Sequence, residues 1–297
     1  MGVKMWSRHL MAAALPVGIL CAPNTLLAAA SADIRIEAAF TVDDNVARDR
    51  KGSEKLSDRS FSVQLNKDLI FPVSEHTRLA LVGFLGGEKS LDYSGLSRVF
   101  LGAQGEFQYR TSGDLYAPTF AVFGRISADE YESNLRDGYR YSAGVSVQKF
   151  LTEDIQLFAA LTHNARDGKS TVFDTKDYSA RLSLDYSLSR NATAYVSGEY
   201  RRGDVVPTSR PTLIDVDIAK ALVVDDVFTD TARISYRVRA NTILATLGYN
   251  LALRQGHALD LSWRWVQSTP TASPGFATSE SVRYTVNQFT IAYLVRF

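Results

Sequence analysis

Residues 178–188 read YSARLSLDYSL, and this stretch decides the fold. Every second residue from Tyr178 to Leu188 is apolar or aromatic, whereas the residues between them are serines, Arg181 and Asp185. Successive side chains of a β-strand point to opposite faces, so a period of two indicates a strand between two different environments. One face of this strand meets apolar surroundings, and the other face can hold charge.

The same alternation recurs in twelve segments after residue 33. They span approximately 33–43, 59–71, 77–87, 95–110, 116–128, 137–150, 154–165, 176–190, 192–203, 232–252, 257–268 and 281–297. No stretch after residue 30 approaches the ~18 apolar residues of a membrane helix, and the even strand number is the one that single-chain bacterial barrels have. We expect an all-β protein, a transmembrane antiparallel up-and-down β-barrel of about 12 strands. A soluble β-sandwich is the alternative, but its core would not favour charges at the middle of strands.

The connections between these segments alternate in length. Those near Pro72, Ser112, Thr152, Arg190 and Gln255 are short, and those near Gly52, Lys89, Glu132, Asp167, Pro211 and Pro274 are longer. Membrane barrels have short periplasmic turns and long outer loops, so we expect both chain ends in the periplasm. This orientation predicts two aromatic girdles on the lipid face, an outer one of Tyr139, Tyr141, Tyr178, Tyr200 and Trp265 and an inner one of Tyr109, Tyr186, Tyr249 and Phe297.

The first 30 residues have the organisation of a secretory signal peptide. Lys4 and Arg8 form a basic start, residues 10–20 are mostly apolar, and small residues precede possible cleavage sites after Ala30 or Ala32. We therefore expect residues 31–297 to form a single barrel domain. Cys21 is the only cysteine, so the exported chain would have no disulfides. Removal of two basic residues lowers a formal net charge of +1, and no bulk charge argues for nucleic acid.

Charged residues on the inner face of the predicted strands are the main functional candidates. By alternation they point into the lumen, because charges at mid-membrane depth cannot face lipid. The candidates are Arg125, Arg140, Arg181, Arg264, Glu106, Asp185, Glu199 and Asp260, with Arg35, Glu37 and Arg201 beside them. They form either a mutually paired network that fills the barrel or a charged lining that selects solutes. The sequence leaves both interpretations open, since twelve strands lie between filled and open barrels.

Catalytic and metal-binding sites are weakly indicated. His163 falls on the lipid face near the outer rim, but its neighbours at two-residue spacing are Leu161 and Ala165, so no nucleophile accompanies it. Acidic clusters occur at Asp43/Asp44, Asp129/Glu130/Glu132 and Asp225/Asp226, without the spacing of a calcium loop. We expect no catalytic residues, no metal and no cofactor.

A long connection at about residues 204–231 is unusually apolar between Leu213 and Val224. Long structureless loops in compact domains are uncommon unless they have a function. This connection could fold inward as a constriction, pack over the mouth as a lid or dock on a partner. A simple extension of strands above the membrane is the alternative.

The chain ends in TIAYLVRF, with Ile291, Tyr293, Val295 and Phe297 at alternating positions. This ending resembles the C-terminal signal of bacterial outer-membrane β-barrel proteins, although Ala292 stands where glycine is common. The resemblance implies the outer membrane of a Gram-negative bacterium, insertion by the barrel assembly machinery, and contact with membrane lipids and lipopolysaccharide.

Residues 42–48, VDDNVAR, are similar to the first hairpin of several poorly characterised porin-like barrels. This resemblance favours a porin-like channel for small hydrophilic solutes or for export. The alternatives are a non-conducting structural, adhesive or assembly barrel that acts through its outer loops, and thirdly a lipid-acting membrane enzyme.

The terminal motif generates a first prediction. Deletion of Phe297, or its replacement by a charged residue, should block membrane insertion and leave periplasmic protein for degradation, because the alternating ending is lost. Immunoblots of membrane fractions measure the outcome. Normal outer-membrane levels of such a variant would contradict the assignment of this motif.

Overall fold

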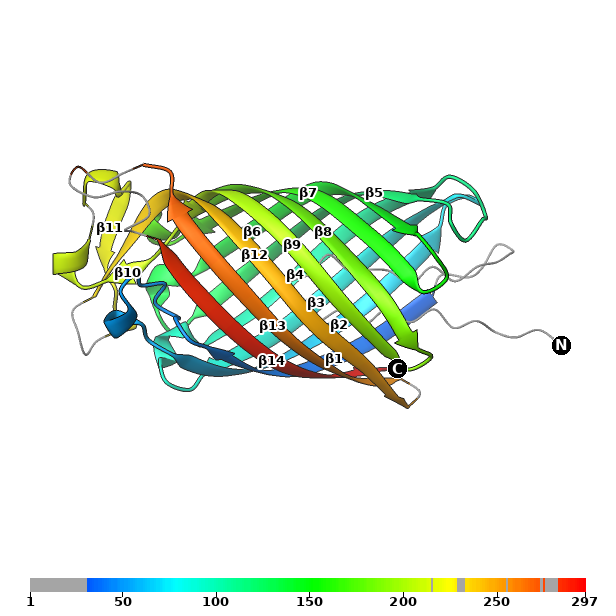
Figure 1. Cartoon of the computed structure of the whole chain (residues 1–297), viewed down its shortest axis with the longest axis horizontal. Coiled ribbons are helices and arrows are strands. Elements are labelled where there is room, and N and C mark those ends of the chain that lie inside the picture. Colours follow the sequence, from blue (N-terminus) through cyan, green and yellow to red (C-terminus); the bar gives the residue numbers. More distant parts are fainter. Residues whose placement is uncertain (1–30, 215, 229–232, 255, 273–274, 276–282) are drawn as a thin grey trace.

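The computed structural model describes residues 31–214, 216–228, 233–254, 256–272, 275 and 283–297 (Figure 1). The predicted signal peptide lies outside the described residues, and a cut after Ala32 would fall within the first strand. Among the described residues, no helix has both the length and the apolar character needed to cross a bilayer.

Twelve long strands form a closed antiparallel barrel. They are β1 (Ser31–Asp43), β2 (Asp58–Pro72), β3 (Thr77–Ser90), β4 (Arg98–Arg110), β5 (Thr119–Tyr131), β6 (Gly138–Phe150), β7 (Ile155–Gly168), β8 (Thr175–Ser189), β9 (Ala192–Val205), β12 (Ile234–Arg254), β13 (His257–Pro270) and β14 (Tyr284–Arg296). Each strand pairs with its neighbour in sequence, and β9 pairs with β12. The ring closes where β1 pairs with β14, from Arg35 opposite Arg296 to Asp43 opposite Gln288. The expected fold class is confirmed.

The two ends of the barrel differ. The five short connections between β2 and β3, β4 and β5, β6 and β7, β8 and β9, and β12 and β13 lie at one end, here called the turn end, beside the C-terminus (Figure 1). The long connections lie at the other end, here called the loop end. They contain short 3-10 helices: η1 (Gly52–Glu54), η2 (Ser94–Leu96), η3 (Asn134–Arg136), η4 (Thr171–Phe173), η5 (Pro211–Leu213) and η6 (Val216–Ile218).

Several strands extend further toward the loop end than the sequence predicted. β5 continues to Tyr131 and β7 to Gly168, three residues beyond their expected ends. The long connection after β9 also contains two strands that were not expected as such, β10 (Thr208–Ser209) and β11 (Ala221–Val224). Both pair with the first residues of β12, which rises beyond the ring. Strand extension, the alternative weighed for this connection, is therefore part of the structure.

The outer surface of the barrel is apolar. Leu101, Val122, Leu161 and Leu182 are each more than half exposed, and they come from strands all along one wall. The rings of both expected girdles are also exposed, from Tyr178 near the loop end to Phe297 at the turn end, except that of Trp265, which is half-buried. Inward positions carry polar and charged residues instead. This segregation matches a barrel whose outer face contacts lipid.

Closure of the ring leads to a second prediction. Each of the twelve long strands has two hydrogen-bonded neighbours, so the barrel has no open edge from which detergent could unfold the sheet. Unheated protein should therefore resist SDS and migrate differently on a gel from boiled protein. Recovery of the protein in a soluble periplasmic fraction, with no heat-dependent shift, would contradict the architecture.

Candidate functional site

The barrel encloses a cavity of about 740 Å³, and arginine is the charged residue that dominates its wall. Seven arginines and five carboxylates line it: Arg98, Arg125, Arg140, Arg166, Arg181, Arg201 and Arg264, with Glu37, Glu88, Asp129, Asp177 and Glu199. The arginines come from six consecutive strands, β4 to β9, and from β13. The cavity wall is therefore polar, with an excess of positive charge.

The structure divides the predicted lumen residues into two groups. Arg125, Arg140, Arg181, Arg264 and Glu199 line the cavity, as does Arg201. Glu106, Asp185 and Asp260 point inward but lie closer to the turn end and do not line it.

Near the turn end, the inward polar groups bond to one another. Asp260 is fully buried and accepts hydrogen bonds from the Tyr195 hydroxyl (3.0 Å) and the Asn250 amide (3.4 Å). Glu106 accepts one from Gln108, and Arg35 forms an ion pair with Asp68 (2.7 Å). Inward polar groups near the turn end thus bond to one another, whereas the charged groups of the cavity surround an open space.

Four arginines on β4 to β7 form a cluster around Asp129. Arg98 contacts Asp129 Oδ1 through Nη1 (2.8 Å), and Arg140 contacts Oδ2 through Nε (2.9 Å). Both also donate to the Tyr131 hydroxyl. Arg166 lies directly opposite Arg140 in the sheet. Like charges at opposed positions destabilise a sheet, so this arrangement favours an anion between them.

Arg125 completes this cluster and lacks an acidic partner. Its guanidinium lies 4.0 Å from the centre of the Phe84 ring. Among the described residues it has no ion-pair partner, and its side chain faces the cavity. A guanidinium stacked on an aromatic face keeps its N–H edge available for a carboxylate or phosphate.

A second group of arginines lines the cavity from β8, β9 and β13. Arg201 forms an ion pair with Glu199 (2.5 Å), and Arg181 lies opposite Glu199 in the sheet. Arg264 lies opposite Thr246 and Gln288, on β12 and β14. This part of the cavity wall therefore also contains several guanidinium groups, with Glu199 among them.

Sequence reasoning missed Arg166 and misplaced Asp129, for one reason. Both lie in the last residues of β7 and β5, beyond the predicted strand ends, so alternation was not applied to them. Asp129 was grouped with loop carboxylates, yet it is buried inside the barrel. Continuing the period of two by three residues would have pointed both side chains inward.

A third set of lumen residues, also missed, pairs aromatic rings with glycines. Phe100 lies opposite Gly86, Phe84 opposite Gly102, and Phe123 opposite Gly144, each on the neighbouring strand. A Cβ on Gly86 would lie 2.6 Å from Phe100 Cζ, and one on Gly144 would lie 2.7 Å from Phe123 Cζ. Each ring therefore lies flat on the wall, in space that only glycine leaves open. The sequence signal that could have identified these pairs was an aromatic residue at an inward position of a predicted strand.

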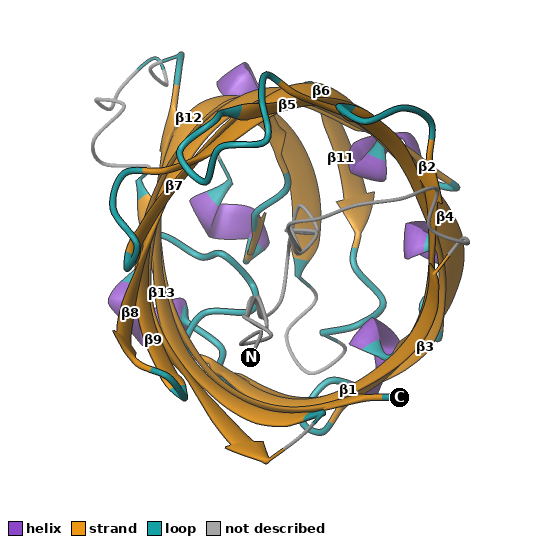
Figure 2. Cartoon of the chain, turned by 90° about the vertical axis from the view of Figure 1, so that its right-hand side faces the viewer, coloured by secondary structure: helices purple, strands orange, loops and turns teal. Residues whose placement is uncertain are grey.

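The loop end is covered by a segment here called the cap, residues 206–228 and 233–237, of which 215 is not described. Seen along the barrel axis, β11 lies within the outline of the ring (Figure 2). Val227 contacts Gly95, and the Phe228 ring is 5.0 Å from that of Tyr93. These partners lie between β3 and β4, on the side of the ring opposite β9 and β12. The cap therefore crosses the whole mouth.

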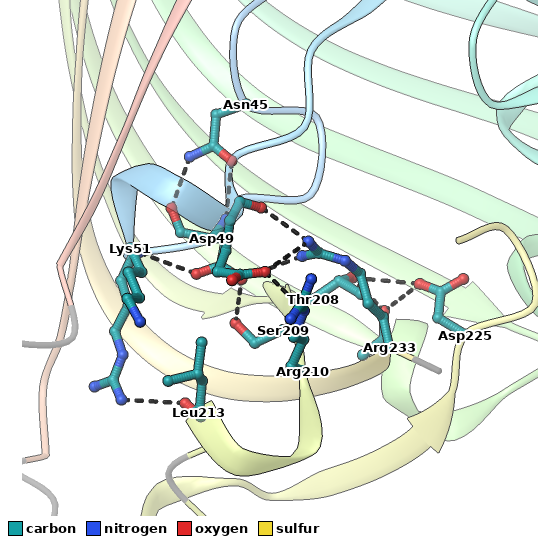
Figure 3. A network of polar contacts seen from close by, with 12 residues as sticks. Asn45, Asp49, Lys51, Thr208, Ser209, Arg210, Leu213, Asp225 and Arg233 are labelled. Carbon is teal, nitrogen blue, oxygen red and sulfur yellow. Dashed lines mark hydrogen bonds and ion pairs between the residues drawn. The ribbon is translucent and has the colours of Figure 1, made fainter. Parts of the chain in front are cut away.

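A buried polar network ties the cap to the connection after β1 (Figure 3). Arg233 contacts Asp49 Oδ2 (3.3 Å) and Glu54 Oε2 (3.2 Å), and the Ser209 hydroxyl donates to Asp49 (2.8 Å). Asp49 is fully buried, and Asn45 holds it by accepting from its backbone N–H (2.9 Å). Removing one partner from such a buried pair costs about 3–5 kcal/mol, so this anchor holds the cap firmly.

A second anchor joins the cap to the connection after β5. Arg136 binds Asp225 through two hydrogen bonds (2.9 and 2.6 Å), and Ser235 also donates to Asp225. Burial of the Asp225 carboxyl opposes its ionisation. The bonds and charge of Arg136 outweigh this effect and hold the pKa of Asp225 below its ordinary value.

The apolar stretch between Leu213 and Val224 includes β11, which pairs with β12 and lies within the outline of the ring in Figure 2. Val216, Leu222 and Val224 are exposed, whereas Val227 and Phe228 pack onto Ala47 and its neighbours. Strand extension, one of the alternatives for this stretch, therefore accounts for part of it.

The remaining candidates have structural surroundings. His163 lies on the outward face, where its ring is 4.6 Å from that of Tyr178. Asp43 accepts hydrogen bonds from Asn45 and Gln288, and Asp44 accepts from Asn287. Among the described residues, no three potential metal ligands gather in one place.

Comparisons with known proteins bear on the fold. No protein-family model and no curated protein sequence matches this chain. An outer-membrane channel from Pseudomonas putida F1 has a similar structure, with a TM-score of 0.57, 13% identity and 100% of both chains covered. The KdgM porin in complex with disordered oligogalacturonate is more distant, with a TM-score of 0.46, 9% identity, and 89% of this chain and 99% of that chain covered. The chain thus has the fold of a solved outer-membrane channel.

The Asp225 anchor generates a third prediction. Because its pKa is lowered by folding, it stabilises the closed cap above the unfolded value of about 3.9, and this contribution is lost as the pH falls through the folded pKa. At pH 7, Asp225→Asn should accelerate amide hydrogen exchange in residues 221–228 by roughly 10-fold or more, since bonds to charged groups contribute about 1.5–3 kcal/mol.

As the pH falls through the folded pKa of Asp225, the exchange rates of the variant and the native protein should converge. Comparing the two proteins at the same pH cancels the intrinsic pH dependence of exchange. A rate ratio that stays constant from pH 7 down to the pH at which the native cap loses its protection would show that Asp225 does not hold the cap through its charge.

Proposed function

We propose that the protein is a porin-like channel in the outer membrane of a Gram-negative bacterium, passing small hydrophilic solutes with a preference for anions. One observation carries this proposal: a closed barrel with an apolar exterior encloses a cavity of about 740 Å³ lined by seven arginines and five carboxylates. A barrel serving only as a scaffold has no need for so many charges around an internal space. The cost of placing them there favours a role in solute passage.

The proposed orientation follows from the connections. Short turns of membrane barrels are periplasmic and long loops are external, so the turn end faces the periplasm and the cap faces the outside. The predicted signal peptide and the terminal motif agree with this route, in which residues 1–30 are removed and β14 is read by the assembly machinery. Ile291 and Tyr293 are exposed on the outer face of β14, and Phe297 is exposed just after its end, where such machinery and membrane lipids would meet them.

Anion preference follows from the arginines of the cavity. Positive groups in a narrow, low-dielectric lumen raise the local concentration of anions. Arg125 contributes most to this proposal, because Asp129, the acidic group of its cluster, is engaged by Arg98 and Arg140. The effect acts over about 10 Å at 0.1 M salt and about 3 Å at 1 M salt.

A non-conducting barrel is the second candidate, favoured by the cap. The cap crosses the mouth on two buried anchors, and it exposes Val216, Leu222 and Val224 at its outer surface. Exposed apolar side chains on an outer loop suit contact with a partner. The two candidates differ in whether the closed cap still admits ions. An enzymatic role is not proposed, since His163 has no nucleophile on its own strand.

Planar-bilayer recording provides the fourth prediction. The native barrel should conduct, and removal of residues 208–228 should increase its conductance because the mouth is uncovered. Arg181→Ala combined with Arg264→Ala should lower the anion-to-cation permeability ratio severalfold at about 0.1 M salt, and less at 1 M salt.

Arg202→Ala is the matched control, because Arg202 is adjacent to Arg201 in sequence but exposed on the opposite face of β9. It should leave the permeability ratio unchanged. Silence of both the native and the shortened barrel would refute the channel and favour the non-conducting candidate.

A further inference from the structure

The cavity wall on β3 to β6 combines two kinds of chemistry. Phe84, Phe100 and Phe123 lie flat against it, each over a glycine on the next strand. Arg98 and Arg125 lie among these rings, at 5.1 Å from the centre of Phe100 and 4.0 Å from that of Phe84. All five side chains line the same cavity. The wall is therefore an aromatic surface edged with guanidinium groups.

The glycines are what make this surface flat. A side chain at Gly86 or Gly144 would push the opposing ring off the wall and into the lumen. Phe100 and Phe123 remain half-buried and present their free faces to the cavity, whereas Phe84 is buried beneath Arg125. Flat rings leave the cavity open while offering apolar contact to whatever occupies it.

A simple anion would use only half of this surface. Chloride or acetate can reach the guanidinium N–H groups but makes no use of aromatic faces. A planar ring can stack on Phe100, Phe123 or the free face of the Arg125 guanidinium, and a carboxylate on that ring can bond to the arginine edges. A cavity of about 740 Å³ has room for a single-ring solute.

We propose that this wall, formed by Phe100, Phe123 and Arg125 with Arg98 and Arg140, is a binding site for small aromatic carboxylates. The proposal deepens the proposed function by naming a solute class for the same cavity. It rests on the proposed channel function only for the route by which the solute enters the cavity, because binding itself requires no ion flow.

An internal comparison separates this proposal from a purely structural explanation. Tyr195 lies flat over Gly248 in the same manner, but this pair is outside the cavity, and its hydroxyl bonds to Asp260. An aromatic ring packed over a glycine is therefore not sufficient to form a binding site. The wall on β3 to β6 differs from the Tyr195 pair in having arginines and open space before its rings.

Binding of benzoate and of acetate to the folded, detergent-solubilised barrel tests the proposal by isothermal titration. Benzoate should bind about tenfold more tightly than acetate, because ring stacking adds to the shared carboxylate contact. Phe100→Leu with Phe123→Leu should bring the two affinities within about threefold of each other, while Arg125→Gln should weaken both. Tyr195→Leu, the matched control, should leave the benzoate preference unchanged.

Heat-dependent gel migration identifies the variants that have folded. Equal binding of benzoate and acetate by the native protein would overturn the proposal, as would a benzoate preference that survives the double phenylalanine replacement. Benzoate binding in a barrel that is silent in bilayers would refute the channel and leave this site standing. Conductance without a benzoate preference would refute the site alone.

Discussion

Closure of the sheet between β1 and β14 is the constraint on which the rest of the structure depends. A strand edge left open in lipid would expose unpaired backbone groups, each at a cost of several kcal/mol, so the ring must close. Once it is closed, every residue faces either the lumen or the outside, and the alternation of the sequence fixes which. Arg35 stands opposite Arg296 at one end of this seam and Asp43 opposite Gln288 at the other. Charge is thereby confined to the interior, where it must pair or meet water.

The charged groups of the lumen either pair or meet water, and which of the two occurs differs along the barrel. Toward the turn end, Asp260 and Glu106 bond to neutral partners and are buried. In the cavity, arginines outnumber carboxylates, and Arg140 faces Arg166 across adjacent strands. A purely structural network would balance its charges, whereas a surface that meets transient anions does not need to. The cap covers this surface from the loop end, through anchors at Asp49 and Asp225 that involve two other connections.

The number and order of the strands, and the face to which each residue points, could be predicted. Each depends on the alternation of apolar and polar residues along the chain. Arg181 and Arg264 were placed correctly for this reason. The cap could not be predicted, because its anchors join residues such as Asp49 and Arg233 that are far apart in sequence and carry no periodic signal. The role of the apolar stretch around Leu222 was left open, since hydrophobicity alone does not distinguish edge pairing from inward packing. The glycine–aromatic pairs depend on register between strands, which the sequence of one strand does not contain.

Labelling of single introduced cysteines tests most directly whether water and anions fill the cavity. Two neighbouring residues of one strand should differ, because one faces the cavity and the next faces lipid. The only cysteine, Cys21, lies in the predicted signal peptide, so introduced thiols are unique. Ser142 lines the cavity opposite Arg125, and Ala143 faces outward opposite Gly124. Ser142→Cys should react with charged methanethiosulfonates, faster with an anionic reagent than with a cationic one, and Ala143→Cys should react with neither. Equal reaction at both positions, or no reaction at Ser142→Cys, would contradict the account.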